Sequence, residues 1–261
     1  MNADVHAHTS YSDGGSIPRM LRGAADAGLD AVGFTDHCSL SEAWRDERLL
    51  WNRNFDRTYE RRREALTLAE RDHDVRTYDA VEVDYEPELE ERIASFLDRA
   101  GFDYAIGSVH YVAGRQVFAF ESFADADPAE RRRFVDVYYD AVVSLVESEL
   151  FAVVAHVDLI ENHPDLRGLT TATHRRRVVE ACANSRTIPE INAGRTGQKG
   201  SFDQFHPNEA LLDRLLERDV AVTVGTDAHD PDDFERRVPR LERLLSDRGI
   251  GPVGPADLSA T

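Results

Sequence analysis

Pairs of potential metal ligands lie near both ends of the chain. His6 and His8 stand two residues apart in "DVHAH", and Asp227 and His229 stand two apart in "GTDAHDP". Residues two apart in an extended strand point to the same side, so each pair can present both side chains to one partner. Neutral imidazoles and carboxylates are ligands for zinc, manganese and iron. Each pair is therefore a candidate part of a metal site.

Further candidate ligands follow short apolar runs elsewhere in the sequence. They are Asp13, His37 in "FTDH", Glu82 in "VEVDY", His110 in "GSVHY" and His156 in "VVAH". One histidine at a strand end is more often an ordinary polar residue than a ligand. Six of the ten histidines occupy such positions, however, which favours a shared site over coincidence. Because one catalytic zinc ion takes about three protein ligands, we predict two or three divalent ions of zinc, manganese or iron.

The nine candidate ligands divide into three predicted groups that share one carboxylate. The groups are His6, His8, Glu82 and Asp227 for a first ion, Glu82, His110 and His156 for a second, and Asp13, His37 and His229 for a third. Glu82 occurs twice because a carboxylate can bridge two ions.

The remaining histidines fall in expected helices or loops. His73, His163 and His174 are expected to be ordinary surface residues. His206 differs, because "FHPN" opens the helix that follows the sixth expected strand. Cys38, next to the ligand candidate in "TDHC", is expected to be a small buried residue rather than a thiolate ligand.

The elements that must position these residues alternate along the chain. Strands are expected at 3–8, 31–36, 76–85, 104–111, 151–157, 188–193 and 220–226, and helices near 17–28, 56–71, 88–100, 128–149, 172–184, 208–217 and 232–247. Seven strand–helix couplets predict a parallel sheet with helices outside, as an open doubly wound sheet or a closed barrel. Both forms place active-site residues at the C-terminal ends of the strands.

Two segments are expected to lie outside this regular pattern. Residues 38–55 form the longest irregular stretch and are a candidate loop or lid over one mouth of a barrel. The Gly- and Pro-rich tail from 249 onward is expected to be flexible. No linker divides the chain, so residues 1–261 are expected to form one domain.

The charge balance restricts the partners. The net charge is −18, from 49 acidic and 31 basic residues, and Lys199 is the only lysine. A surface this acidic disfavours binding to a long nucleic acid, because the phosphates would be repelled. The acidic surface indicates a high-salt cytoplasm, although a GC-rich genome would also favour arginine over lysine. An anionic substrate would have to be met by metal ions or by a few placed arginines.

Cysteine usage and hydropathy bear on the compartment. Cys38 and Cys182 are too few for the disulfide framework of a small secreted protein. No apolar run approaches the roughly 18 residues needed to span a bilayer, and the start lacks a signal-peptide pattern. We therefore predict a cytoplasmic protein without a membrane partner. The pattern does not define an oligomeric state.

Taken in order, the motifs resemble a known family. "DVHAHTSYSDGG", "GFTDH", "EVDY", "IGSVHY", "AHVDLI", "EINAG" and "GTDAHDP" are similar to the polymerase-and-histidinol-phosphatase (PHP) superfamily of metal-dependent phosphoesterases. The similarity runs from about residue 4 to 231. It implies a distorted seven-stranded (β/α)7 barrel of the TIM-like type with a trinuclear metal site. Within the superfamily, "IGSVHYVAG" and "EINAG…FHPNEALL" look most like histidinol-phosphate phosphatase.

The resemblance implies residues that act on the substrate. Arg195 in "EINAGR" matches the region of a phosphate-binding arginine, so it is the main candidate for clamping the phosphate. The segment after His156 departs from the family pattern, because Glu161 stands where a basic residue is common, and Arg167 is the candidate substitute. We expect Arg195, Glu82 and Asp227 to act in catalysis, and Arg195, His206 and Arg167 to contact the substrate.

The implied reaction is hydrolysis of a small phosphate monoester, most simply L-histidinol phosphate. A water activated by the ions would attack phosphorus, without a covalent phosphoenzyme. Two alternatives stay open at this point. The same site could act on nucleotides or oligonucleotide ends, as in other PHP-type phosphoesterases and exonucleases. The chain could also be a metal-binding module without turnover.

Overall fold

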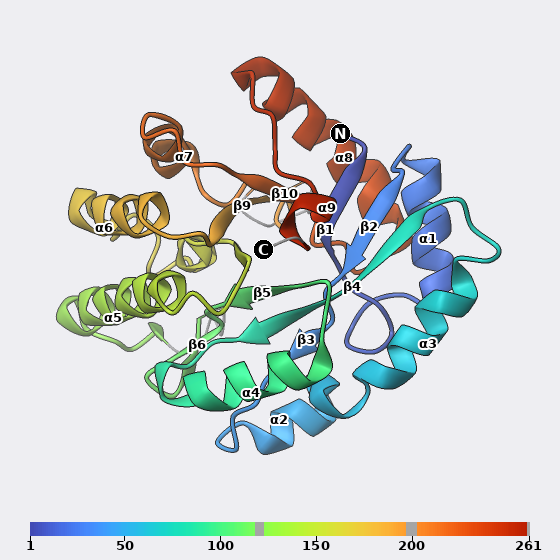
Figure 1. The fold of residues 1–261 in the computed structure, drawn as a ribbon. Helices are drawn as coiled ribbons and strands as arrows, with labels where there is room; N and C mark the ends of the chain where they lie inside the picture. Colours follow the sequence, from blue (N-terminus) through green and yellow to red (C-terminus); the bar gives the residue numbers. More distant parts are fainter. Residues whose placement is uncertain (118–122, 197–202, 260–261) are drawn as a thin grey trace.

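Parallel strands form the centre of the molecule, and most of the helices surround them (Figure 1). The structure is a computed structural model that describes residues 1–117, 123–196 and 203–259. The strands are β1 (Ala3–Ala7), β2 (Ala31–Phe34), β3 (His37–Cys38), β4 (Arg76–Asp84), β5 (Tyr104–Ser108), β6 (Tyr111–Val112), β7 (Arg115–Gln116), β8 (Val153–Val154), β9 (Ile188–Asn192) and β10 (Thr223–Gly225). The helices are α1 (Ile17–Asp26), α2 (Arg45–Leu50), α3 (Tyr59–Ala69), α4 (Glu90–Ala100), α5 (Pro128–Glu147), α6 (Ala172–Ala183), α7 (Glu209–Leu216), α8 (Pro231–Arg248) and α9 (Pro255–Leu258).

The sheet curls into a nearly closed barrel. Its strands follow the order β1-β2-β4-β5-β8-β9-β10, and neighbouring strands along this path are parallel. The two ends of the path meet, because Ala7 forms a parallel bridge with Ala228, just beyond β10. The predicted seven-stranded α/β barrel is confirmed, and the open sheet is excluded. The short strand β3 pairs with β4 beside this path.

The seven expected helices are all present, with boundaries that differ by a few residues. Local signals explain several ends. Asp230 caps α8 by accepting a hydrogen bond from the backbone N–H of Asp232, and Gly249 ends the helix with a left-handed φ of 64°. The buried faces of α1 and α8 contribute Leu21 and Phe234 to one apolar cluster, so the first and last long helices lie together.

The expectation of a flexible tail is wrong for most of residues 249–259, and the expectation of an irregular stretch at 38–55 holds only in part. Residues 38–55 contain part of β3 and the helix α2, so the segment is not a simple loop. In the tail, the backbone N–H of Val253 donates to Val222 O at 2.8 Å, and α9 follows. Leu258 is buried in a cluster that includes Val5 and Ile106, and α9 lies near the centre of the ring of helices (Figure 1). Burial of this apolar side chain holds the described part of the tail in place.

The described ranges contain no helix that is both long enough and apolar enough to cross a membrane.

Candidate metal centre

The first predicted group of ligands lies where β1 meets the end of β10. His6 Nε2 is 3.2 Å from His8 Nε2, and His8 Nε2 is 3.1 Å from Asp227 Oδ1. Glu82, from β4, completes the group with Oε2 at 3.4 Å from His6 Nε2. Two donors that bind one ion at about 2.1 Å lie roughly 3.4 Å apart in tetrahedral geometry. The spacing of these four side chains therefore fits a shared ion.

The second group surrounds the other oxygen of the same carboxylate. Glu82 Oε1 is 3.2 Å from His156 Nε2 and 3.7 Å from His110 Nε2. His110 follows β5 by two residues, and His156 follows β8 by two. The rings of these two histidines are 5.1 Å apart, so they face the carboxylate from neighbouring strands. Glu82 thus presents one oxygen to the first group and the other to the second, and its predicted role as a bridge between two ions stays a prediction.

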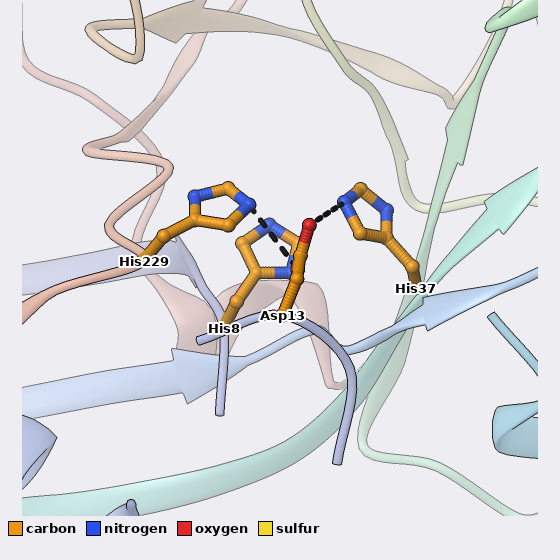
Figure 2. Close-up of side chains that lie close together, drawn as sticks. All are labelled: His8, Asp13, His37 and His229. Atoms are coloured by element: carbon orange, nitrogen blue, oxygen red, sulfur yellow. Dashed lines mark ion pairs between the residues drawn. The ribbon is translucent and has the colours of Figure 1, made fainter. Parts of the chain in front are cut away.

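The third group centres on the loop after β1. Asp13 lies between His37 and His229, and its oxygens are 3.7 Å from His37 Nε2 and 3.3 Å from His229 Nε2 (Figure 2). His8 adjoins this group, since its ring stacks on His229 at 4.1 Å. One correction concerns His37, which does not end β2 but begins β3 and pairs with Glu82 in the register of β4. This pairing brings His37 Nδ1 to 2.7 Å from Glu82 Oε2, so the three groups share side chains.

One buried carboxylate oxygen at the centre of these groups lacks a hydrogen-bond partner among the described residues. It is Glu82 Oε2, which lies 3.4 Å from His6 Nε2 and 2.7 Å from His37 Nδ1. Leaving a buried polar atom unsatisfied costs about 1–3 kcal/mol, so this oxygen requires an explanation. A cation beside it would provide one. The donor set, which is rich in imidazole with carboxylates, fits zinc, manganese or iron.

Further carboxylates hold the ligand rings in position. His6 Nδ1 donates to Glu190 Oε1 at 2.8 Å, and His110 Nδ1 donates to Asp84 Oδ1 at 2.6 Å. A proton on Nδ1 of each ring would be held by this carboxylate, so Nε2 would be the nitrogen that binds a metal. The sequence analysis missed both carboxylates. Strand alternation offered one signal, because Asp84 lies two residues from Glu82 and therefore on the same side of β4.

The ionisation of the predicted ligands suits metal binding in part. Burial, together with His229 and His37, lowers the pKa of His8 to about 4, so its ring is neutral near pH 7. Burial alone would raise the pKa of Glu82, but the neighbouring histidines, led by His37 and His6, hold the pKa well below its usual range. The pKa of Asp227 is likewise held low, mainly by His6, against the effect of burial. These three groups would bind metal without first losing a proton. His6, His156 and His229 differ, because neighbouring carboxylates raise their pKa values against the effect of burial, so these rings would release a proton on binding.

Two glycines leave room for carboxylates of the site. A Cβ added to Gly225 would clash with the Glu190 carboxylate and with His6 Cβ, and one added to Gly194 would clash with the Asp227 carboxylate, so a larger residue at either position would displace these side chains. Asp227 itself has a left-handed φ of 54°. Arg237, from α8, stabilises this backbone by donating to Asp227 O at 2.7 Å. Strained backbone of this kind concentrates at functional sites.

A cavity of about 320 Å³ opens onto the ligands. Its wall includes seven of the nine predicted ligands. The other two do not line the cavity, but His6 contacts Glu82 and His8 contacts Asp227. Arg195 and His206 also line the cavity, so the structure brings these two predicted substrate residues to the site. Arg53 lines it as well, which the sequence analysis missed. A larger cavity of about 710 Å³, lined by α7 and the end of α8, contains none of the nine ligands.

Other expectations about individual residues need correction. Arg167 does not line the 320 Å³ cavity; its Nε donates to Glu161 O at 2.9 Å, within the same loop. His163 and His174 are buried rather than on the surface. His163 contacts Phe123, and His174 stacks on Tyr139 and accepts the backbone N–H of Thr171, the N-cap of α6. Cys38 is a free, fully buried thiol, as expected, and burial raises its pKa.

The fold and the site together define a class of protein. It is a parallel βα barrel in which imidazole and carboxylate donors converge beyond the C-terminal ends of the strands. Residues 4–192 match the family model described as the PHP domain, and the chain belongs to this family. The resemblance read from the motifs is therefore confirmed.

Named relatives match nearly the whole chain. The chain is 25% identical over 251 residues to a Deinococcus radiodurans protein named "Probable histidinol-phosphatase", covering 94% of this chain and 93% of that protein. It is 23% identical over 255 residues to the Bacillus subtilis "Histidinol-phosphatase", covering 88% and 94%. Among solved structures, histidinol phosphate phosphatase from Lactococcus lactis, complexed with Zn, L-histidinol and phosphate, has a TM-score of 0.68 at 20% identity. The match covers 97% of this chain and 95% of that one, and it supports the barrel fold.

Proposed function

We propose that this chain is a metal-dependent phosphatase that hydrolyses L-histidinol phosphate to L-histidinol and phosphate. The observation that carries the proposal is the convergence of nine imidazole and carboxylate side chains, Glu82 among them, in adjoining groups beside a cavity that Arg195 also lines. The relatives named histidinol-phosphatase support the choice of substrate. Residues 1–261 would act as a single PHP phosphoesterase domain.

The three donor groups would hold two or three divalent ions of zinc, manganese or iron. Bound ions of this kind polarise a phosphoryl group and make water nucleophilic near neutral pH. Glu82 would bridge two of the ions, since its oxygens face different groups of histidines. Glu190 and Asp84 would keep His6 and His110 oriented for this task.

Arginines of the cavity would bind the phosphate. A chain with a net charge of −18 repels a phosphate dianion, so local cations are needed. Arg195 is the first candidate. Arg53 is the second, because its largely buried side chain lies 3.6 Å from Asp84 and its Nη1 forms no hydrogen bond with the described residues. Arg237 is committed instead to the backbone oxygens of Thr226 and Asp227.

The size of the cavity favours a small phosphate monoester. About 320 Å³ is at the lower end of the range for small-molecule sites. The acidic surface argues against a long nucleic acid as a partner. Hydrolysis of nucleotides is therefore not expected, and the test below would detect it.

The test is phosphate release by the purified protein from histidinol phosphate, a nucleoside monophosphate and short single-stranded DNA, each with Zn²⁺, Mn²⁺, Fe²⁺ or a chelator. We expect release from histidinol phosphate, and loss of that activity with the chelator and in His8→Ala. Preferred turnover of the nucleotide or DNA would contradict the substrate. Metal binding without any turnover would indicate a non-catalytic module.

A further inference from the structure

His206 occupies a distinctive place beside the predicted metal groups. Its backbone N–H donates to Asn192 O at 3.0 Å, and the Asn192 N–H donates back to His206 O at 2.6 Å. Asn192 ends β9 and pairs with Gly225 of β10, two residues before Asp227. On its other side β9 pairs with β8, which ends two residues before His156. His206 is therefore held between the strand ends that carry two ligand candidates, and it lines the same cavity.

A carboxylate orients the buried ring of His206. Asp158 Oδ1 is 2.6 Å from His206 Nδ1, and Asp158 Oδ2 accepts the backbone N–H of Asn208 at 2.7 Å. This arrangement assigns the Nδ1 proton to the bond with Asp158, which also stabilises a positive charge on the ring. The other nitrogen, Nε2, is buried and forms no hydrogen bond with the described part of the chain. A molecule in the cavity is the natural partner for that atom.

The other polar side chains of the cavity wall are poor proton donors. The predicted metal ligands would offer lone pairs, and Arg53, Arg195 and Arg237 keep their protons at any ordinary pH. Asp233 accepts hydrogen bonds from the backbone N–H groups of His229 and Asp230. His206 is thus the described side chain of this wall best suited to deliver a proton.

We propose that His206 Nε2 protonates the leaving oxygen of the substrate and that Asp158 is its positioning residue. This inference rests on the proposed phosphatase function. Water oxygen bonds to phosphorus, and the ester P–O bond breaks with its electron pair moving to the alkoxide oxygen. That oxygen takes the proton from His206 Nε2 and leaves as an alcohol. His206 regains a proton released from the attacking water, so one water is consumed in each cycle.

The test compares two leaving groups in His206→Gln. An alkoxide is a poor leaving group and needs a proton, whereas 4-nitrophenolate leaves readily without one. We expect kcat/KM to fall by about 10²-fold or more for histidinol phosphate and to change little for 4-nitrophenyl phosphate. Asp158→Asn, which keeps the size of the side chain, is expected to give the same pattern with a smaller loss. The Asp158→Asn variant also allows the same comparison if His206→Gln does not fold.

The matched control is His174→Gln. His174 Nε2 is also paired with a carboxylate, at 2.8 Å from Asp136, but outside the cavity, so the two substrates should be affected equally and little. Metal content, measured by mass spectrometry, should match the wild type in every variant. Equal losses on both substrates in the folded His206 and Asp158 variants would overturn the proton-donor role alone. A wild-type protein that hydrolyses neither substrate would instead overturn the proposed function, and this inference with it.

Discussion

Two buried polar clusters of the barrel lie near each other, but their hydrogen bonding is opposite. In the first, Arg62 is fully buried and donates to Phe34 O and Asp36 through Nη1, and to Asp79 through Nη2. Asp36 in turn accepts from Thr9. In this cluster most donors face acceptors.

The cluster around Glu82 has the reverse character. Here a carboxylate faces the nitrogens of His6, His37 and His156, and its Oε2 forms no hydrogen bond with the described residues. A guanidinium that faces carboxylate and carbonyl oxygens stabilises the fold, whereas converging imidazoles and carboxylates would be completed by added cations. Burial alone would not separate the two clusters. The chemistry of the paired groups does.

The largest effect is expected from a change in the cluster around Glu82. Glu82→Gln keeps the size of the side chain but removes the charge that two groups of donors share. We expect kcat/KM for histidinol phosphate to fall by more than about 10³-fold, because metal stabilisation is worth several kcal/mol and each ~1.4 kcal/mol is tenfold. Metal content should fall in parallel, measured by mass spectrometry after dialysis.

Glu90→Gln is the control for this experiment, since Glu90 accepts from Tyr85 and does not line the cavity. Full activity and metal content in Glu82→Gln would refute the bridging role.

A smaller effect is expected from breaking the cluster around Arg62. Arg62→Met leaves Asp36 buried without its cationic partner, which costs about 3–5 kcal/mol of unfolding free energy. Urea denaturation measures this loss, while metal content and kcat of the folded fraction should stay close to wild type. The neighbouring exposed Arg61→Met should change stability by no more than about 0.5 kcal/mol. If a stable Arg62→Met variant lost metal, the Arg62 cluster would also support metal binding, and the two clusters would not differ in role.

The smallest effect is expected from a comparison of two arginines. Arg195 lines the cavity, and Arg167 bonds to its own loop. Arg195→Gln should lower kcat/KM by about 10- to 100-fold, because a hydrogen bond to a charged group is worth about 1.5–3 kcal/mol. Arg167→Gln should leave kcat/KM close to wild type, since Arg167 bonds to carbonyl oxygens of its own loop. Equal losses in the two variants, measured under the same metal conditions, would remove the phosphate-binding role from Arg195.

Much of the fold was predictable because its signals are local. Strand and helix periodicities placed the barrel elements, and most of the ligand candidates lie at the C-terminal ends of strands. The very short strand β8 shows the limit, because the apolar run 151–157 predicted seven residues where two are paired in the sheet. The tail was misjudged for a related reason. Gly and Pro indicate a flexible end, but Leu258 finds a buried site inside the barrel.

Partners distant in sequence were harder to predict. Glu190 reaches His6 across 184 positions, and Asp158 reaches His206 across 48. Arg53 lies in the stretch expected to be irregular, and nothing in its neighbours places its side chain in the cavity. Arg167 was chosen for its position in the sequence, yet its guanidinium turns to its own loop.

The sequence by itself determined the order of the elements, the family and the identities of the candidate ligands. These follow from periodicity, residue chemistry and motif spacing, all of which are readable along the chain. The tertiary structure decided which oxygen faces which nitrogen, which arginines line the cavity and which ring nitrogens stay without a hydrogen bond among the described residues. Those choices depend on closing the barrel between β1 and β10, because only closure brings the two ends of the chain within hydrogen-bond distance.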